Sequence, residues 1–94
     1  MNTAVGRESL YSNTTAAAAV AVGYQAAYSQ TTAGGTVAVG WQAGYSNVTG
    51  TYNTAVGQSA LYSNTASNNT AVGYQAGYAN TTGTDSVFVG YHAG

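Results

Sequence analysis

A short phrase that ends in Val-Gly recurs six times along the chain of 94 residues, and it restricts the chain to a repetitive fold. Successive phrases are separated by 17, 17, 17, 16 and 17 residues, counted between Gly6, Gly23, Gly40, Gly57, Gly73 and Gly90. A period this short and regular is typical of a solenoid, in which each repeat forms one coil that stacks on the next. We therefore expect one repeat domain over 1–94, with repeats near 2–18, 19–35, 36–52, 53–68, 69–85 and 86–94.

Each repeat is predicted to run strand, glycine bend, strand and polar loop. The first strand is the triplet before the glycine, where β-branched residues alternate with alanine, so the two residue types fall on opposite faces. Both faces are apolar, which favours a parallel strand buried on both sides. A second strand is expected three to six residues after the glycine, for example over 60–63. We expect the valine before each glycine to form a structural core ladder inside the coils: Val5, Val22, Val39, Val56, Val72 and Val89.

One stretch allows a competing prediction. Residues 14–22 include four consecutive alanines, which would suit a helix, but the in-register triplet Val20–Val22 and the following Gly23 favour a strand.

Large apolar residues are scarce, because valine, leucine, isoleucine and phenylalanine together number 13 of 94. This fraction is low for a domain with a core of its own. The net charge of -1 does not hold the chain open by repulsion. We therefore expect several copies of the chain to share a core. The chain begins and ends inside the repeat pattern, so we also expect it to be a segment of a longer protein.

Charged side chains are limited to Arg7, Glu8 and Asp85, and His92 is the only histidine. Without a basic patch the chain lacks the electrostatic footprint of a nucleic-acid binder. It has no cysteine for a disulfide or a thiolate metal site, and no apolar run of membrane-spanning length. Glu8 and Asp85 fall near opposite ends of the repeat array, too far apart to act as a catalytic pair. We expect no enzyme activity, no metal site and no cofactor.

The stretch 69–83 reads N-T-A-V-G-Y-Q-A-G-Y-A-N-T-T-G, and it resembles the head repeat of YadA-like trimeric adhesins. It is more similar still to the variant repeats of phage and bacterial tail-fibre proteins, and the resemblance extends over essentially the whole chain. The resemblance implies an all-β, left-handed parallel β-roll, a β-solenoid of six coils. It also implies a homotrimer of three chains side by side, located on an extracellular, cell-surface or virion fibre.

Two aromatic columns are candidate sites. The fifth residue after each of the first five glycines is tyrosine: Tyr11, Tyr28, Tyr45, Tyr62 and Tyr78. Two interpretations of this column compete: each ring packs on its neighbour one coil away, or the rings form a sugar-stacking stripe. The residue directly after each glycine is more variable, because Arg7 and Gln58 occur beside four aromatics, and this mixture indicates solvent exposure. Candidates for stacking on a glycan or a partner are Tyr24, Trp41, Tyr74 and Tyr91, and a tolerant surface position is the alternative.

Asparagine or glutamine occupies the seventh position after each glycine, where stacked amides can form a ladder: Asn13, Gln30, Asn47, Asn64 and Asn80. Asn-x-Thr sequons occur at Asn13, Asn47, Asn68 and Asn80, although bonds from turn asparagines to the backbone account for these residues equally well.

The leading functional hypothesis is a structural and adhesive segment of a trimeric fibre, which spaces or presents a receptor-binding surface. Its partners would be other copies of the chain and a cell-surface glycan or protein receptor. Two alternatives stay open. One is a filament subunit that stacks coil ends, and the other is a carbohydrate-binding module that acts through the exposed aromatic column.

Overall fold

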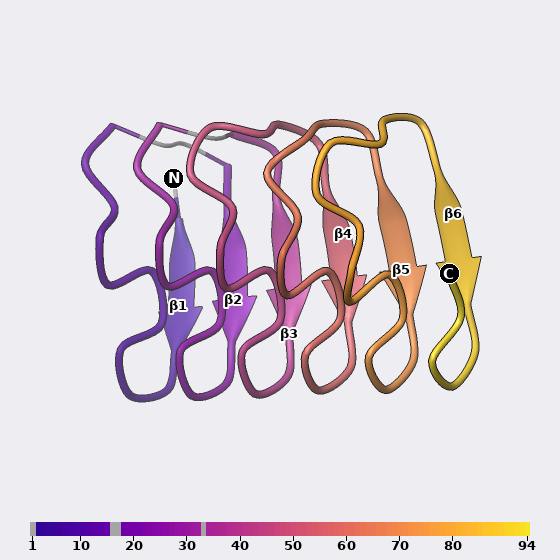
Figure 1. Ribbon diagram of the computed structural model, residues 1–94. Helices are drawn as coiled ribbons and strands as arrows, with labels where there is room; N and C mark the ends of the chain where they lie inside the picture. The colour runs from indigo at the N-terminus through magenta and orange to yellow at the C-terminus, as the bar shows by residue number, and fades with distance from the viewer. Residues whose placement is uncertain (1, 16–17, 33) are drawn as a thin grey trace.

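The computed structural model describes residues 2–15, 18–32 and 34–94, and they form one parallel β-solenoid (Figure 1). Each coil contributes one short strand, and the strands pair in chain order to make a six-stranded sheet along one wall. The strands are β1 Thr3–Val5, β2 Val20–Val22, β3 Val37–Val39, β4 Thr54–Val56, β5 Thr70–Val72 and β6 Val87–Val89. The rod measures 30 × 22 × 16 Å along its principal axes.

The all-β solenoid predicted from the glycine period is confirmed. Within the described residues of the stretch 14–22 the chain forms β2 and no helix, while residues 16–17 of that competing prediction lie outside the described part.

The repeated phrase stacks on itself in register from coil to coil. Thr3 pairs with Val20, Val20 with Val37 and Val37 with Thr54. The 16-residue spacing does not disturb the sheet, since Thr54 still pairs with Thr70. The loop before β5 absorbs the missing residue, because a loop tolerates a deletion that a strand cannot.

The stretch after each glycine forms two successive turns, so the prediction of a second strand over 60–63 is wrong. The reason is positive φ at alternate residues, such as 59° at Ser59 and 51° at Leu61. The Ala60 N–H closes the first turn on the Gly57 carbonyl at 3.2 Å, and the Asn64 N–H closes the second on the Leu61 carbonyl at 3.2 Å. Turns of neighbouring coils are nevertheless bonded to each other, for example from the Leu61 N–H to the Ala76 carbonyl at 2.9 Å.

The glycine that ends each phrase is required for two reasons. All six have φ between 119° and 131°, a region that side chains with a Cβ rarely adopt. At the first five, a Cβ atom would also lie only 2.6 to 2.9 Å from the backbone of the glycine in the next coil. The glycine column therefore lets neighbouring coils approach closely at the bend.

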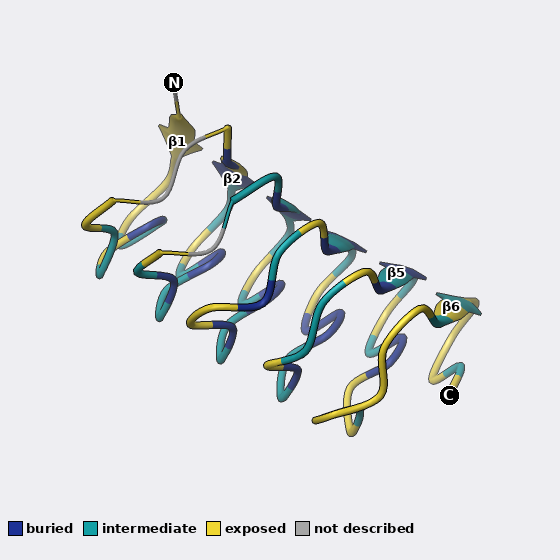
Figure 2. Ribbon diagram, turned by 90° about the horizontal axis from the view of Figure 1, so that it is seen from above, coloured by how far each residue is buried: buried dark blue, intermediate teal, exposed yellow. Residues whose placement is uncertain are grey.

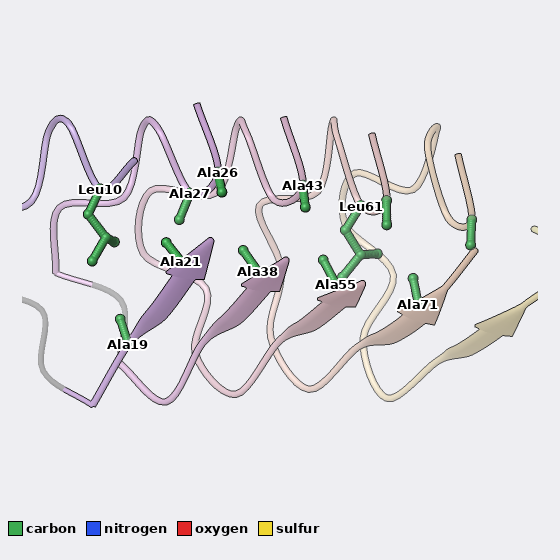
Figure 3. Packing of buried hydrophobic residues seen from close by; sticks show 12 residues of the cluster. Leu10, Ala19, Ala21, Ala26, Ala27, Ala38, Ala43, Ala55, Leu61 and Ala71 are labelled. Atoms are coloured by element: carbon green, nitrogen blue, oxygen red, sulfur yellow. The ribbon is translucent and has the colours of Figure 1, made fainter. Parts of the chain in front are cut away.

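Alanines, not valines, occupy the inside of the coils. Ala21, Ala38, Ala55 and Ala71 are at most 1% exposed, and they point from their strands toward the opposite wall of turns (Figure 3). Because strand side chains alternate, the valines on either side of each alanine point outward. The prediction that the core ladder inside the coil consists of Val5, Val22, Val39, Val56, Val72 and Val89 is therefore wrong. The two walls stand close enough that a methyl group fills the space between them.

Glycine makes room for large side chains in the later coils of this thin core, whereas Leu10 in the first coil is buried beside Ala27 of the same column. Leu61 is 1% exposed and lies in a column in which the neighbouring coils have Gly44 and Gly77. A Cβ on Gly77 would lie 2.8 Å from Cδ2 of Leu61 and 2.8 Å from Cδ2 of Phe88. Phe88 can thus replace the strand alanine in the last coil because Gly77 leaves room for its ring.

Candidate interaction surfaces

The outer side of the sheet carries a flat strip of β-branched side chains, which we call the valine face. It consists of Thr3, Val5, Val20, Val22, Val37, Val39, Thr54, Val56, Thr70, Val72, Val87 and Val89. Five of its valines are 37% to 72% exposed: Val5, Val20, Val72, Val87 and Val89. The face contains no charged residue, and exposure is greatest in the first and last coils (Figure 2). A contiguous apolar surface of this kind is typical of an interaction site.

The tyrosines five residues after each glycine form a continuous stack on the turn side. Neighbouring ring centroids lie 5.0 to 5.1 Å apart, and the ring planes differ by 1° to 9° along Tyr11, Tyr28, Tyr45, Tyr62 and Tyr78. Each interior ring has a neighbour on both faces and presents only its edge to solvent. A sugar ring needs an open aromatic face, so this geometry favours packing over the sugar-stacking alternative.

Two phenols of this stack have shifted acidity. Burial raises the pKa of the Tyr62 hydroxyl above 10, and the neighbouring tyrosines Tyr45 and Tyr78 raise it further. The pKa of Tyr28 is raised by partial burial first and then by the negative charge of Glu8. Both shifts favour the neutral phenol within the stack.

The residues directly after the glycines form a second, more open column, which we call the aromatic stripe: Tyr24, Trp41, Tyr74 and Tyr91. These rings are 39% to 76% exposed, in agreement with the exposure expected from the sequence. Tyr24 and Trp41 meet edge to face, with centroids 6.4 Å apart and planes at 69°. Tyr74 and Tyr91 stack at 5.2 Å, and the exposed Gln58 interrupts the column between Trp41 and Tyr74.

A row of polar side chains follows the aromatic stripe one position later in each coil. Gln42 donates from Nε2 to Oε1 of Gln25 at 2.9 Å, and Gln25 donates to Oε1 of Glu8 at 2.9 Å. We call Glu8, Gln25, Gln42 and Gln75 the amide row. In the last coil His92 occupies the same position, and its ring lies 4.2 Å from that of Tyr91. The stripe and the row thus share one surface.

The amide row was not among the sites predicted from the sequence. The available signal was the recurrence of glutamine directly after the aromatic residue, at Gln25, Gln42 and Gln75.

The predicted amide ladder at the seventh position after the glycine includes the step from Asn80 to Asn64. Asn80 donates from Nδ2 to Oδ1 of Asn64 at 2.9 Å. Asn47 instead caps its own loop, because it donates to the Gly50 carbonyl at 2.8 Å and accepts from the Gly50 N–H at 3.1 Å. These amides therefore fix the polar loops as well as the stack.

A further column, four residues before each glycine, holds asparagine in three of the six coils and connects neighbouring coils. Asn69 is fully buried and accepts from the Ser86 N–H at 3.0 Å. Its Nδ2 donates to the Gly83 carbonyl at 2.7 Å and to Oδ1 of Asn64 at 3.1 Å. In the third coil the same position holds Thr36, a buried residue whose Oγ1 has no partner within the described part of the chain.

The four sequons differ in access. Asn47 is buried and its amide nitrogen is bonded to the Gly50 carbonyl, and Asn80 is bonded through the same atom. Asn13 is half-buried, whereas Asn68 is exposed on the loop before β5. Of the four, Asn68 is thus the most accessible to modification.

Among the residues described, no three of histidine, cysteine, aspartate and glutamate lie close enough to hold a metal ion, and no pocket is present. Over the same ranges no helix is long and apolar enough to cross a membrane. Comparison with protein-family models, curated proteins and solved structures finds no match to this chain.

Proposed function

We propose that this chain is a structural and adhesive segment of a trimeric fibre outside the cell, in which three copies pack side by side through the valine face. The fibre would lie on a cell surface or on a virion, and the segment would space or present a receptor-binding surface. The coils need no partner to close, because alanines fill each coil from within. The valine face is therefore free to form the shared core that the composition led us to expect.

The valine face is the observation that supports this proposal best. A solvated outer side of a sheet ordinarily carries polar residues, whereas this one carries valine or threonine at all twelve positions. Six strands about 4.8 Å apart give a strip roughly 25 Å long, which matches a long contact parallel to the rod axis. A stable contact buries about 800 Å² on each partner, so the strip would be its apolar centre and the residues that flank it the rim.

A single substitution separates coil closure from assembly. Val39 lies in the middle of the valine face and points away from the coil interior, so Val39→Asp should leave each coil folded while it places a carboxylate in the apolar contact. We expect circular dichroism like that of the parent, together with the mass of one chain by light scattering. The matched control is Thr49→Asp, which adds the same charge at an exposed loop position off the face.

Two results would contradict this function. If Val39→Asp unfolds the chain under conditions where the parent is a single chain, the valines belong to the coil interior. If Val39→Asp and Thr49→Asp both leave the parent's assembly intact, the valine face is not the contact. Growth of the parent into open-ended particles would instead favour the filament alternative.

A further inference from the structure

The aromatic stripe has no part in closing the coil. Trp41 is 52% exposed and Tyr91 76%, whereas the same coils close on buried alanines and glycines. Four large rings exposed in one column make a surface that the fold itself does not require. The stripe is therefore a candidate for binding something other than its own chain.

The stripe differs from the tyrosine stack in the availability of ring faces at Tyr24 and Trp41, whereas Tyr74 and Tyr91 stack on each other at 5.2 Å. In the stack, neighbours cover both faces of every interior ring at about 5 Å. In the stripe, the edge-to-face contact between Tyr24 and Trp41, at 69°, leaves ring face uncovered by the neighbour. Gln58 follows Trp41 in the column, so no aromatic ring stacks on Trp41 from that side. Trp41 is thus the best placed ring to receive a planar apolar ligand surface.

Hydrogen-bonding groups of the appropriate kind lie beside these rings. A primary amide both donates and accepts, which suits hydroxyl groups. In the amide row the bonds from Gln42 to Gln25 and from Gln25 to Glu8 use one donor of each glutamine, so the second N–H of each amide remains for a ligand. Charge is limited to Arg7 and Glu8 in the first coil, so the surface offers nothing to a strongly charged ligand.

We propose that the aromatic stripe and the amide row together bind a neutral, β-linked polysaccharide that lies along the axis of the rod. The apolar face of a pyranose ring would stack on Trp41, and its hydroxyls would bond to the amides alongside. Coils repeat at about 4.8 Å, close to the length of one sugar unit, so one unit would correspond to one coil. A β-linked chain can stay extended over several coils, as this spacing requires. This inference rests on the proposed fibre function only in treating the polysaccharide as the receptor of the fibre. The stripe itself is present in a single chain.

Trp41 is the only tryptophan of the chain, so its fluorescence reports directly on this surface. The parent should bind cellohexaose, a β-1,4-linked glucan, with a change in tryptophan emission, and it should bind α-linked maltohexaose at least tenfold more weakly. Isothermal titration calorimetry, which does not need the fluorophore, should give at least a tenfold loss of affinity for Trp41→Ala. Trp41→Phe should retain part of the affinity, and Gln58→Tyr should weaken binding because a tyrosine at 58 would cover the side of Trp41 that Gln58 leaves open.

The control is Tyr52→Ala, which removes an exposed aromatic ring from a loop outside the stripe. The proposal is overturned if the parent fails to bind cellohexaose at millimolar concentration, or if Trp41→Ala binds it as tightly as the parent. It is also overturned if Tyr52→Ala weakens binding as much as Trp41→Ala does. Light scattering on the same samples separates the two proposals. If the parent binds cellohexaose as a single chain, only the proposed trimer is contradicted. If Trp41→Ala loses the assembly that the parent forms, the stripe is a contact between chains.

Discussion

Two glycines in the same core column should respond very differently to a single added methyl group. Gly44 and Gly77 both lie four residues after a phrase glycine, and their φ angles are 62° and 63°. Alanine at either position therefore carries the same backbone cost, roughly 1–2 kcal/mol for a left-handed conformation. The surroundings differ, because the Cβ at 44 would meet only the Ala38 methyl, at 3.6 Å.

At position 77 the added Cβ would lie 2.8 Å from both the Leu61 and the Phe88 side chains. Leu61 is enclosed, so the conflict can be relieved only by shifting packed side chains or the backbone, which typically costs a further 1–3 kcal/mol, on the order of an overpacked core. Gly77→Ala should therefore be less stable than Gly44→Ala by about 1–3 kcal/mol. For a domain of this size each kcal/mol corresponds to a shift of about 4–8 °C in Tm.

Thermal unfolding of both variants, followed by circular dichroism at one protein concentration, measures this difference directly. A third variant adds Leu61→Ala to Gly77→Ala, and Leu61→Ala should cost less in that background than in the parent because it removes one of the two conflicts. Equal Tm values for Gly44→Ala and Gly77→Ala would refute the thin-core account, since the backbone cost alone would then explain both.

Three other predictions follow from buried polar groups and from the tyrosine stack. Asn69→Ala removes three hydrogen bonds at a fully buried position and should cost about 3 kcal/mol in the free energy of unfolding, whereas the exposed control Thr82→Ala should change it by less than about 0.5 kcal/mol, both measured by urea denaturation. Thr36→Val, which keeps the shape but removes an unpartnered buried hydroxyl, should instead raise stability by about 1 kcal/mol. The pKa values of Tyr28 and Tyr62 are raised in the folded state, so their contribution to stability is fully present below pH 10 and is lost as the pH rises through the raised pKa. The Tm should fall above pH 10, and the fall should be smaller in Tyr62→Phe; an identical pH profile for that variant would exclude the phenol as its cause.

The glycine period was sufficient to predict the solenoid and the strand before each glycine, whereas the second strand expected over 60–63 is a pair of turns. It could not predict which face of each strand is inside, because alanine on one face and valine on the other are both apolar. The distance between the walls decides this, and the turns set that distance. The positive φ angles of these turns occur at residues such as Gln25 and Leu61, and neither residue type predicts this conformation. One feature of the sequence did indicate closely spaced walls: Gly44 and Gly77 occupy the same repeat position as Leu61.

The candidate surfaces, too, could be predicted from the sequence only in part. Exposure of the aromatic stripe could be predicted because Arg7 and Gln58 share one column with the four aromatic residues. The recurrence of glutamine after the aromatic residue was a sign of the amide row, but the bond from Gln42 to Gln25 depends on neighbouring coils bringing equivalent side chains within reach. Side-chain types thus indicated which positions are tolerant, and the stacking geometry determined which of them act together.

We propose that each chain closes its own coils on alanine and presents its valines to other copies. Sedimentation equilibrium of the parent chain over a wide concentration range tests this claim most directly. We expect a single species with three times the mass of one chain. A folded species with the mass of one chain at every concentration would contradict the claim, because the valine face would then remain exposed to water.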